Sequence, residues 1–595
     1  MKQASEAPLA ELITSGSLSD SVVNHAAETP DQVALRRRTP AGWQDVTSAE
    51  FLSEVQALAK GLMAAGVAHG QRIAIMSATR YEWTLADYAG WFVGATVVPI
   101  YETSSAEQVE WILSDADCVA VFLEGDKHRA VYDQVADRVP TREVWVFDDG
   151  VIDELAALGA SVSDEDLEAR RAAVGPDDIA TIIYTSGTTG RPKGCVLTQA
   201  NIRFETDNVV GAMPDLFAAR GSTLLFIPLA HVFGRVIEIG CIESGTILGH
   251  SANVKDIVTD LGKFQPTFLL SVPRVFEKVF NSAQMKATAE GKGRIFEMAA
   301  NTAINYSKAM DTGGPGLTLR LKHLVFDKLV YSKLRSALGG KVEYAVSGGA
   351  PLGARLGHFF RGIGITILEG YGLTETSAAS TINLPDAIRI GTVGRPMPGA
   401  AVRIADDGEI LLKGGQIFQG YWKNQAATDE VLEPDGWFHS GDIGELDSEG
   451  FLRITGRKKE LIVTAGGKNV APAVLEDRIR ANWLVSQCMV VGDNRPFIAA
   501  LITLDVEAVP AWLEQNDRPA DTPLADLASD ALILAEVQAA VDTANRAVSH
   551  AEAIKKFHVL EVDWTEEGGQ LTPSMKLKRN VVMKEFGASV EALYA

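Results

Sequence analysis

The sequence predicts an α/β protein with a large N-terminal domain of helix-covered β-sheets plus a β-barrel-like subdomain, followed by a smaller, mobile α+β lid domain. Three observations lead to this prediction. Short apolar runs alternate with helical patterns from residue 50 to about residue 370, hairpin-like strands begin near residue 401, and helices mix with strands after residue 460. Regular alternation of strands and helices is typical of a mainly parallel sheet covered by helices.

The strands predicted in the first part are continuous apolar runs, as expected for strands buried on both faces. They comprise residues 72–76, 95–100, 180–184, 223–228, 267–272, 342–346 and 365–369. Several end in clusters of Gly, Ser or Thr, and ligands of open α/β sheets bind beyond the carboxyl ends of strands. We therefore expect the functional site in those loops.

The later elements follow from changes in the pattern. Long helices are expected from residue 276 to residue 338, broken by the Gly-rich segment 312–316, and residues 524–554 read as one long amphipathic helix. The runs 402–404 and 409–413 form a hairpin around an Asp-Asp-Gly turn. We place the domain boundary at residues 457–460.

Basic residues gather in the second half of the long-helix region, at Lys322, Lys328, Lys333 and Arg335. They fit either a solvated helix face or a surface that faces a membrane, and a solvated face is the simpler interpretation.

Charge and cysteine content exclude several classes of protein. The net charge is −22, which argues against a nucleic-acid binder, because such a protein needs a basic face to neutralise phosphates. The four cysteines are scattered without metal-ligand or disulfide spacing, which indicates a reducing, cytoplasmic location. No apolar run reaches the roughly 20 residues of a membrane helix. Peripheral contact with a membrane stays open.

A run of glycines and hydroxyl residues follows the strand predicted at 180–184. It consists of Thr185, Ser186, Gly187, Thr188, Thr189 and Gly190, and Lys193 comes shortly after it. Glycines let backbone N–H groups approach phosphate oxygens, hydroxyls add donors, and the lysine adds positive charge. The spacing differs from a Walker A loop. By composition this is a triphosphate cradle, and a surface turn is the alternative.

Four more motifs accompany this loop in a fixed order, at residues 369–376, 436–442, 456–462 and 571–579. With them the chain resembles the ANL superfamily of adenylate-forming (AMP-binding) enzymes over roughly residues 20–590. The segments 228–235, 271–278 and 347–352 are similar to those of long-chain fatty acyl-CoA synthetases. Ordered motifs are more specific than any single one.

The resemblance implies an acid–thiol ligase that uses ATP to convert a fatty acid to an acyl-adenylate with release of pyrophosphate, and then transfers the acyl group to coenzyme A. Two anions meet in the first step, so cations are needed. It further implies that Glu375 and Thr185 bind Mg²⁺, which prefers oxygen ligands. A capping role in the local turn is the alternative for Glu375.

The resemblance also implies the ATP contacts. Tyr371 would stack on adenine, although a role in the core is the alternative, and Asp442 would accept hydrogen bonds from the ribose hydroxyls. The remaining residues assigned to ATP are Gly349, Ala350, Glu369, Gly370, Gly372, Thr374 and Arg457. These residues and the acyl site belong to an N-terminal AMP-binding domain, residues 1–457.

Lys576 matches the catalytic lysine of the family, in a lid domain formed by residues 458–595. Met575 precedes it where many relatives have glycine, which leaves open whether Lys576 or Lys578 is the active residue. His231 corresponds to a histidine that lies beside the acyl carboxylate in the family. The alternative is a buried histidine that forms its hydrogen bonds within the protein core.

Lys459 occupies the hinge position at which the lid rotates between the two half-reactions, and Gly466 and Gly467 would then line the path of coenzyme A. The acyl tunnel is expected among Phe226, Val232, Phe233, Leu269 and Val272. No acidic residue follows His231 in the segment 232–235, so the ammonium group of an amino acid would stay unpaired there.

Two alternatives remain at this stage. One is a fatty acyl-AMP ligase that delivers to an acyl carrier protein, although no insertion that would block lid rotation occurs between residues 441 and 468. The other is an inactive adenylate-binding regulatory module. Acyl chain length, saturation and oligomeric state are not determined by these motifs.

Overall fold

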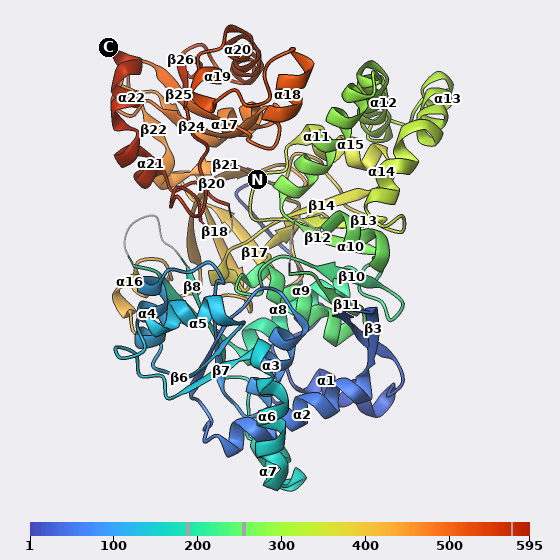
Figure 1. Ribbon diagram of the computed structural model, residues 1–595, viewed down its shortest axis with the longest axis vertical. Helices are drawn as coiled ribbons and strands as arrows, with labels where there is room; N and C mark the ends of the chain where they lie inside the picture. The colour runs from blue at the N-terminus through green and yellow to red at the C-terminus, as the bar shows by residue number, and fades with distance from the viewer. Residues whose placement is uncertain (186–190, 253–256, 573–574) are drawn as a thin grey trace.

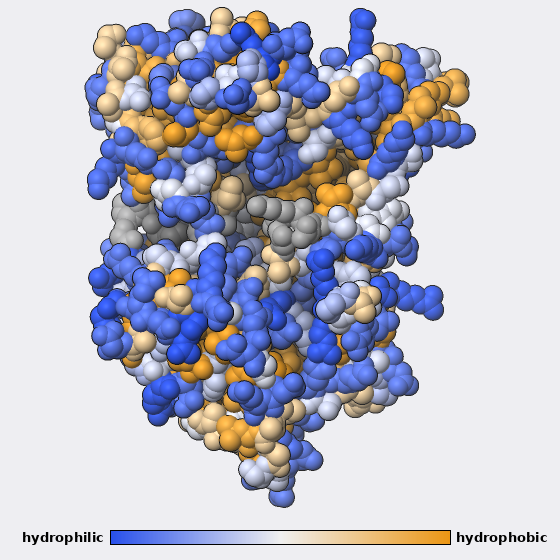
Figure 2. All heavy atoms as spheres, viewed as in Figure 1, coloured by the Kyte–Doolittle hydropathy of each residue, from blue (hydrophilic) through white to orange (hydrophobic). Residues whose placement is uncertain are grey.

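The computed structural model describes residues 1–185, 191–252, 257–572 and 575–595. Figure 1 shows the N-terminal sheets and their helices in the lower and right-hand parts of the molecule and the C-terminal elements at the top. The surface is hollowed where the two parts meet (Figure 2). Helices cover β-sheets throughout, which confirms the predicted fold class.

The largest sheet has seven strands. In spatial order they are β19 (Gly420–Tyr421), β9 (Lys193–Thr198), β8 (Ile179–Thr185), β5 (Thr96–Ile100), β4 (Arg72–Met76), β6 (Cys118–Leu123) and β7 (Glu143–Val146). The strands from β8 to β7 are parallel, as predicted, whereas β9 and β19 are antiparallel additions at one edge. Helix α3 (Tyr81–Phe92) is almost entirely buried, which explains its apolar character on all sides.

Helices of the same region connect and cover these strands. They are α1 (Asp20–Glu28), α2 (Ser48–Ala64), α4 (Ala106–Asp115), α5 (Asp126–Asp133), α6 (Val151–Leu158), α7 (Asp164–Ala172) and α8 (Gln199–Ala212). Thr47 and Ser105 each form a capping box that starts α2 and α4. Both helices thus begin where side chains satisfy the first free N–H groups.

A second sheet and a third sheet complete the N-terminal layers. The second contains β10 (Ser222–Leu225), β11 (Ile247–His250), β2 (Val33–Thr39) and β3 (Gly42–Thr47). The third contains β12 (Phe268–Ser271), β13 (Tyr344–Ser347), β14 (Thr366–Tyr371), β15 (Thr381–Ile382) and β16 (Arg395–Pro396). The predicted strand 223–228 was too long, because the chain turns after Leu225 and the N–H of His231 bonds to the carbonyl of Pro228 at 3.0 Å.

The following helices lie around the second and third sheets, and only some of them reach the right-hand tip in Figure 1. They are α9 (Val232–Ser244), α10 (Ile257–Phe264), α11 (Pro273–Ala289), α12 (Gly293–Met310), α13 (Leu317–Phe326), a π-helix (Asp327–Tyr331), α14 (Ser332–Ala337) and α15 (Ala354–Gly362). The predicted break at 312–316 separates α12 from α13, as expected.

The expected barrel-like part is an antiparallel five-stranded sheet. Its strands are β1 (Gln3–Ser5), β17 (Ala400–Ile404), β18 (Glu409–Gly414), β20 (Phe438–Leu446) and β21 (Leu452–Arg457). Strands β17 and β18 form the predicted hairpin, and Gly408 takes a positive φ of 87° in the turn, a conformation that suits glycine.

The C-terminal part has a three-stranded sheet and a two-stranded one. Its elements are β22 (Ile462–Val463), β23 (Asn469–Val470), α17 (Pro472–Arg480), β24 (Val485–Val491), β25 (Ile498–Leu504), α18 (Val509–Gln515), α19 (Leu524–Leu527), α20 (Ala531–Asn545), β26 (Ile554–Val559), α21 (Arg579–Glu585) and α22 (Gly587–Tyr594). The single helix predicted at 524–554 was wrong. Asp530 caps a new helix by accepting from the N–H of Leu532 at 2.8 Å, and Asn545 bonds to both backbone groups of Ile554 and turns the chain into β26.

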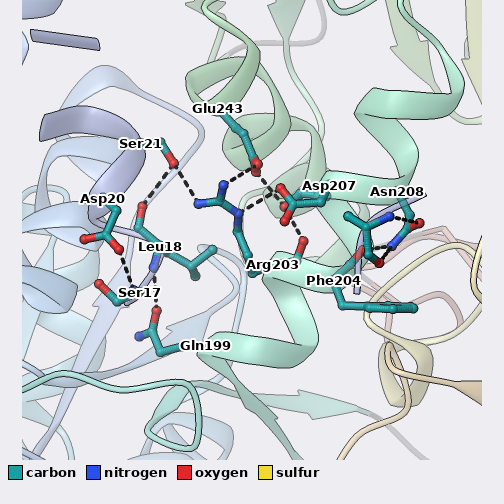
Figure 3. A network of polar contacts seen from close by, with 12 residues as sticks. Ser17, Leu18, Asp20, Ser21, Gln199, Arg203, Phe204, Asp207, Asn208 and Glu243 are labelled. Atoms are coloured by element: carbon teal, nitrogen blue, oxygen red, sulfur yellow. Dashed lines mark hydrogen bonds and ion pairs between the residues drawn. The ribbon is translucent and has the colours of Figure 1, made fainter. Parts of the chain in front are cut away.

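The start of the chain is anchored to α8 by a polar network (Figure 3). Arg203 of α8 pairs with Asp207 at 2.8 Å and with Glu243 of α9 at 3.0 Å. The side-chain oxygen of Asn208 accepts from the N–H of Leu9 at 2.8 Å. Helix α8 is therefore fixed from several sides. Its Glu205 accepts a hydrogen bond from the N–H of Ala379 at 2.7 Å.

The apolar core divides near the expected boundary. The largest buried cluster draws on residues from Leu18 to Leu452, and another is formed by residues from Ile462 to Val559. Among the described residues, no helix is both long and apolar enough to cross a membrane. All four cysteines are buried and free. The exact boundary at residue 457 stays a prediction.

Candidate active site

Tyr371, Asp442 and Arg457 come together from three strands. Tyr371 ends β14 and donates its hydroxyl to Asp442 Oδ2 at 2.7 Å, while Arg457 Nε lies 3.1 Å from Asp442 Oδ1. Asp442 and Arg457 face each other in the register of β20 and β21. Burial and the neighbouring Asp442 raise the pKa of Tyr371 well above its ordinary value, so its hydroxyl remains a donor.

Glu375 and Thr185 both lie next to Cys195. Tyr421 donates its hydroxyl to Glu375 Oε1 at 2.7 Å, and Thr185 Oγ1 lies 3.9 Å from Cys195 Sγ. Burial and the charge of Glu375 raise the pKa of the Cys195 thiol well above its usual value, which keeps it neutral. Lys193 Nζ lies 4.7 Å from the centroid of the Tyr421 ring.

Tyr421 is the residue that sequence reasoning missed. Tyr421 belongs to β19, which pairs with β9 so that Tyr421 lies opposite Cys195. The segment before β19 also contacts the Glu375 backbone, because the N–H of Phe418 donates to the Glu375 carbonyl at 2.9 Å. No acid–base or phosphate-loop pattern surrounds Tyr421 in the sequence. A two-residue edge strand carries too little periodicity to be detected.

Five residues of the predicted phosphate loop, Ser186, Gly187, Thr188, Thr189 and Gly190, lie outside the described residues. Its two ends are described. Thr185 closes β8, Lys193 opens β9, and the two are paired in the ladder. Thr185 and Lys193, which flank the loop, are therefore neighbours on adjacent strands.

Lys576 reaches this cluster from the C-terminal part. Solvent reaches part of Lys576, but protein atoms surround its ammonium group. Burial and the charge of Arg457 lower the pKa of Lys576, and the carboxylates of Asp442 and Glu375 oppose this shift. The N–H of Lys576 donates to Thr572 Oγ1 at 3.0 Å. Lys578 instead precedes α21, and its N–H bonds to the carbonyl of Gln570 at 2.8 Å.

His231 caps α9 and lies within the electrostatic reach of Lys576. Its Nδ1 accepts from the N–H of Phe233 at 3.2 Å, and the protein around the half-buried ring, with the charge of Lys576 added, lowers its pKa to about 3. A neutral imidazole that accepts at Nδ1 carries its proton on Nε2. His231 is therefore neutral, and its Nε2–H has no hydrogen-bond partner among the residues that the structure describes.

The segment around Glu369 is shaped by its glycines. A Cβ at Gly372 would lie 1.4 Å from the carbonyl oxygen of Ala378, so no other residue fits without moving the backbone. Glu369 accepts from the N–H of Leu352 at 3.1 Å, and burial raises its pKa to about 7. Gly370 pairs with Ile382 in the β14–β15 ladder.

Three further residues assigned to ATP lie at turns beside these strands. Thr374 begins the short 3₁₀ turn that contains Glu375. Gly349 and Ala350 are exposed just after β13, and Gly349 has a positive φ of 81°. No atom of the described residues lies within 4 Å of a Cβ placed on Gly349, so these residues leave the space next to the turn open.

The hinge candidate Lys459 lies between two anchored neighbours. Lys458 pairs with Asp407 at 2.6 Å and Glu409 at 3.0 Å, both on the N-terminal side, whereas Glu460 lies 3.4 Å from Arg579 of the C-terminal part. Lys459 itself is exposed. Gly466 and Gly467 lie in an exposed turn, so the structure does not bring them into the cluster.

The residues expected around the acyl chain belong to the largest buried cluster or, like Phe233 and Val272, pack against it. Phe226, Val232 and Leu269 are buried, and Phe233 is partly buried, with its ring 3.4 Å from a Cβ placed on Gly348. A cavity of about 360 Å³ lies elsewhere, in the C-terminal part, and contains none of the predicted site residues. It is lined by Trp483, Trp512, Gln515, Asn516, Leu532 and Glu536.

Within the described ranges, no group of three or more His, Cys, Asp or Glu side chains could hold a metal ion. The predicted site needs fewer protein ligands than such a group, because one carboxylate, one hydroxyl and substrate phosphates can hold Mg²⁺. Tyr421 bonds to only one of the two carboxylate oxygens of Glu375. Thr185 and Glu375 are both neighbours of Cys195. These donors fit that ion.

The chain matches the AMP-binding enzyme family over residues 22–422 and the AMP-binding enzyme C-terminal domain over residues 459–595. It is 53% identical over 577 residues to the long-chain-fatty-acid–CoA ligase FadD15 of Mycobacterium bovis, covering 96% of both chains. It is 29% identical over 603 residues to the human long-chain-fatty-acid–CoA ligase ACSBG1, covering 95% of this chain and 83% of the human protein.

A solved structure agrees with the fold. The A domain of a carboxylic acid reductase from Segniliparus rugosus, in complex with AMP and a co-purified carboxylic acid, matches with a TM-score of 0.75 and 22% identity. The match covers 97% of this chain and 94% of that domain. At this identity the likeness concerns the fold alone.

Proposed function

The chain belongs to the AMP-binding enzymes, and we propose that within this family it is a long-chain fatty acid–CoA ligase, an acid–thiol ligase that forms AMP. The observation that carries this proposal is the position of Lys576. Its ammonium group comes from the C-terminal part and lies within the electrostatic reach of Arg457, Asp442 and Glu375. The 53% identity to a ligase of that name over 96% of the chain supports the substrate class.

In the first half-reaction the fatty acid carboxylate attacks the α-phosphate of ATP. Tyr371 and Asp442 would hold adenine and ribose, with Arg457 beside them, and Lys193 and Thr374 would contact phosphate oxygens. Lys576 would stabilise the charge that develops on the reacting phosphate, since a lysine acts as a mobile point charge. The loop residues 186–190 complete the phosphate contacts in this proposal.

His231 would hold the acyl carboxylate in place. Because its ring is neutral with the proton on Nε2, it can donate a hydrogen bond to that carboxylate without neutralising it. The nucleophile thus keeps its negative charge for the attack. The acyl chain would extend along α9 past Val232 and Phe233.

Mg²⁺ would be held by Glu375 and Thr185. When bound, the ion supplies positive charge to the phosphate oxygens. Tyr421 fixes one oxygen of Glu375 through its 2.7 Å hydrogen bond and so orients the other oxygen. The orientation of this carboxylate therefore depends on Tyr421.

The second half-reaction transfers the acyl group to the thiol of coenzyme A. We propose that residues 458–595 rotate about Lys459 for this step, while residues 1–457 keep the adenylate. The ion pairs of Lys458 and Glu460 hold the two flanks of Lys459, so backbone rotation is directed to that residue. Gly466 and Gly467 would then line the coenzyme A path.

We propose a cytoplasmic location, which is compatible with peripheral contact with a membrane. The alternative acceptor is an acyl carrier protein, and an inactive adenylate-binding module is the alternative of another class. Both make a clear prediction. Pyrophosphate without thioester would favour the carrier protein, and neither product would favour the inactive module.

The test is to incubate the protein with ATP, Mg²⁺, a panel of fatty acids and coenzyme A, and to follow pyrophosphate and thioester by mass spectrometry. Lys576→Ala should lower adenylate formation by about 10²- to 10³-fold, the effect of removing one transition-state donor. Conversion of a supplied acyl-adenylate to the thioester should stay within a few-fold of wild type. Lys578→Ala is the matched control, and an equal loss of both half-reactions in Lys576→Ala would contradict the two-state scheme.

A further inference from the structure

Helix α13 and the π-helix after it carry a row of large apolar side chains that point to solvent. We call this row the apolar ridge; its members are Leu317, Leu321, Leu324, Val325 and Leu329. Their exposed fractions run from 55% for Leu329 to 79% for Leu317. Monomeric soluble proteins rarely leave such contiguous apolar surface uncovered, and where they do it marks an interaction site.

Helix α13 and the π-helix pack on the protein through the face opposite the ridge, and this packing fixes the orientation of the ridge. Phe326 and Tyr331 are buried, and Tyr331 donates its hydroxyl to the carbonyl of Ala299 at 2.7 Å. His323 stacks on Tyr306 with centroids 4.0 Å apart and bonds to the carbonyl of Gly362 at 2.6 Å. The ridge therefore stays turned outward while α13 is held on α12 and α15.

Basic residues border the ridge. Arg320, Lys322, Lys328 and Lys333 are exposed, and among the described residues none of the four lies within salt-bridge distance of an acid. Between residues 312 and 335 the chain has five basic residues and a single acidic one, although its net charge is −22. The acidic residue, Asp327, is already paired with Arg335 at 2.7 Å.

The ridge also lies at an outer tip of the molecule. Figure 1 shows α12 and α13 projecting at the upper right, and Figure 2 shows apolar residues gathered at the end of that projection. From Leu317 to Leu329 the helical rise amounts to about 18 Å. A projecting edge of this length can touch a flat surface without hindrance from the rest of the protein.

We propose that the apolar ridge is a docking surface for an anionic lipid membrane. Its apolar side chains would enter the boundary between headgroups and acyl chains, and the bordering lysines and arginine would reach lipid phosphates with their flexible stems. In a symmetric dimer the ridge would face its own copy, and the bordering cations would then repel one another, whereas an anionic headgroup layer pairs with them. The inference rests on the proposed function in one respect, because a long-chain fatty acid partitions into lipid.

Flotation of the full-length protein with vesicles tests this proposal. One set of vesicles is phosphatidylcholine alone, and the other mixes phosphatidylcholine with phosphatidylglycerol. Wild type should bind the anionic vesicles, more weakly at raised salt. Lys322→Gln and Lys328→Gln should each weaken this binding about fivefold, the effect of one cation near an anionic surface. Leu321→Gln with Leu324→Gln should weaken it at least about tenfold.

The matched controls change exposed residues elsewhere. Leu158→Gln with Leu532→Gln alters two leucines of 51% and 49% exposure, and Lys555→Gln alters an exposed lysine of β26. These variants should float like wild type. The proposal is overturned if wild type does not float with anionic vesicles, or if the ridge variants float as well as the controls. It is also overturned if the ridge variants only turn a dimer into a monomer in solution.

The same variants separate this proposal from the ligase function. The ridge contains no residue of the candidate active site, so thioester formation from a dissolved shorter-chain acid without vesicles should be unchanged in Leu321→Gln with Leu324→Gln. Loss of vesicle binding with this activity intact supports the docking surface. A protein that makes no thioester but still floats through the ridge would refute the ligase function and leave the docking surface supported.

Discussion

Tyr421→Phe isolates the role of a residue that no sequence motif marks. The change removes one hydroxyl and leaves the ring that lies 4.7 Å from Lys193 Nζ, so packing is preserved. What is lost is the 2.7 Å hydrogen bond to Glu375 Oε1. A hydrogen bond to a charged group contributes about 1.5–3 kcal/mol, and the carboxylate would also be free to turn. If this bond orients Glu375 for Mg²⁺ and the phosphates, adenylate formation should fall by about 10- to 150-fold.

The assay is pyrophosphate release in single turnover across a range of Mg²⁺ concentrations. We expect the loss to shrink as Mg²⁺ rises, because a poorly oriented ligand weakens ion binding before it affects other contacts. Tyr81→Phe is the control, since Tyr81 donates a comparable 2.9 Å hydrogen bond to Glu54 away from the site. A Tyr421→Phe enzyme with wild-type activity and Mg²⁺ dependence would refute the reasoning.

Two further predictions concern the segment that carries Glu369 and Gly372. Because the pKa of Glu369 rises from 4.5 to about 7, folding favours its protonated form, and its contribution to stability is present below about pH 4.5 and is lost as the pH rises to about 7. The full shift corresponds to about 3 kcal/mol, of which solvent screening of the half-buried group leaves about 2 kcal/mol. Glu369→Gln should therefore gain about 2 kcal/mol over wild type at about pH 8 and nothing at about pH 4, measured by denaturant unfolding, and an equal difference at both pH values would contradict this. Gly372→Ala should lower adenylate formation about 100-fold, since its Cβ would meet the Ala378 carbonyl at 1.4 Å and displace the Glu375 turn, whereas Gly262→Ala, with nothing within 4 Å, should stay near wild type. Normal activity in Gly372→Ala would show that the turn can move without cost.

Much of the fold could be predicted from the sequence because its strands are buried on both faces. Continuous apolar runs such as 72–76 and 180–184 have one stable environment, the centre of a covered sheet, and both are strands of the seven-stranded sheet. The helix predicted at 524–554 failed for a local reason. The apolar spacing continued through Asp530 and past Asn545, and only their side-chain bonds to the backbone end one element and start the next.

The candidate site was predictable where motifs are contiguous. Asp442, Arg457 and Glu375 lie in such segments, and the structure brings them near Lys576 despite their separation in sequence. Tyr421 could not be found this way, because its role comes from the pairing of β19 with β9, a long-range contact that leaves no local pattern. The exposed ridge on α13 was equally hidden. Helical spacing shows that an apolar face exists, but only the packing of α12 and α15 determines whether it is covered.

The contacts between the two parts of the chain suit the rotation of residues 458–595 proposed above. Among the described residues, the largest buried cluster ends at Leu452 and the next along the chain begins at Ile462, so the two parts share no buried apolar cluster there. Contacts across the gap include two ion pairs, Arg274 with Asp505 at 2.8 Å and Lys278 with Glu507 at 2.7 Å, and a long hydrogen bond from Arg355 to the carbonyl of Ala481 at 3.5 Å. The exposed Lys278–Glu507 pair contributes only about 0–1 kcal/mol, whereas the Arg274–Asp505 pair is partly buried. A few ion pairs can bias the position that brings Lys576 to the site and still be outweighed by the binding of a new substrate, which is the energy scale that the proposed rotation requires.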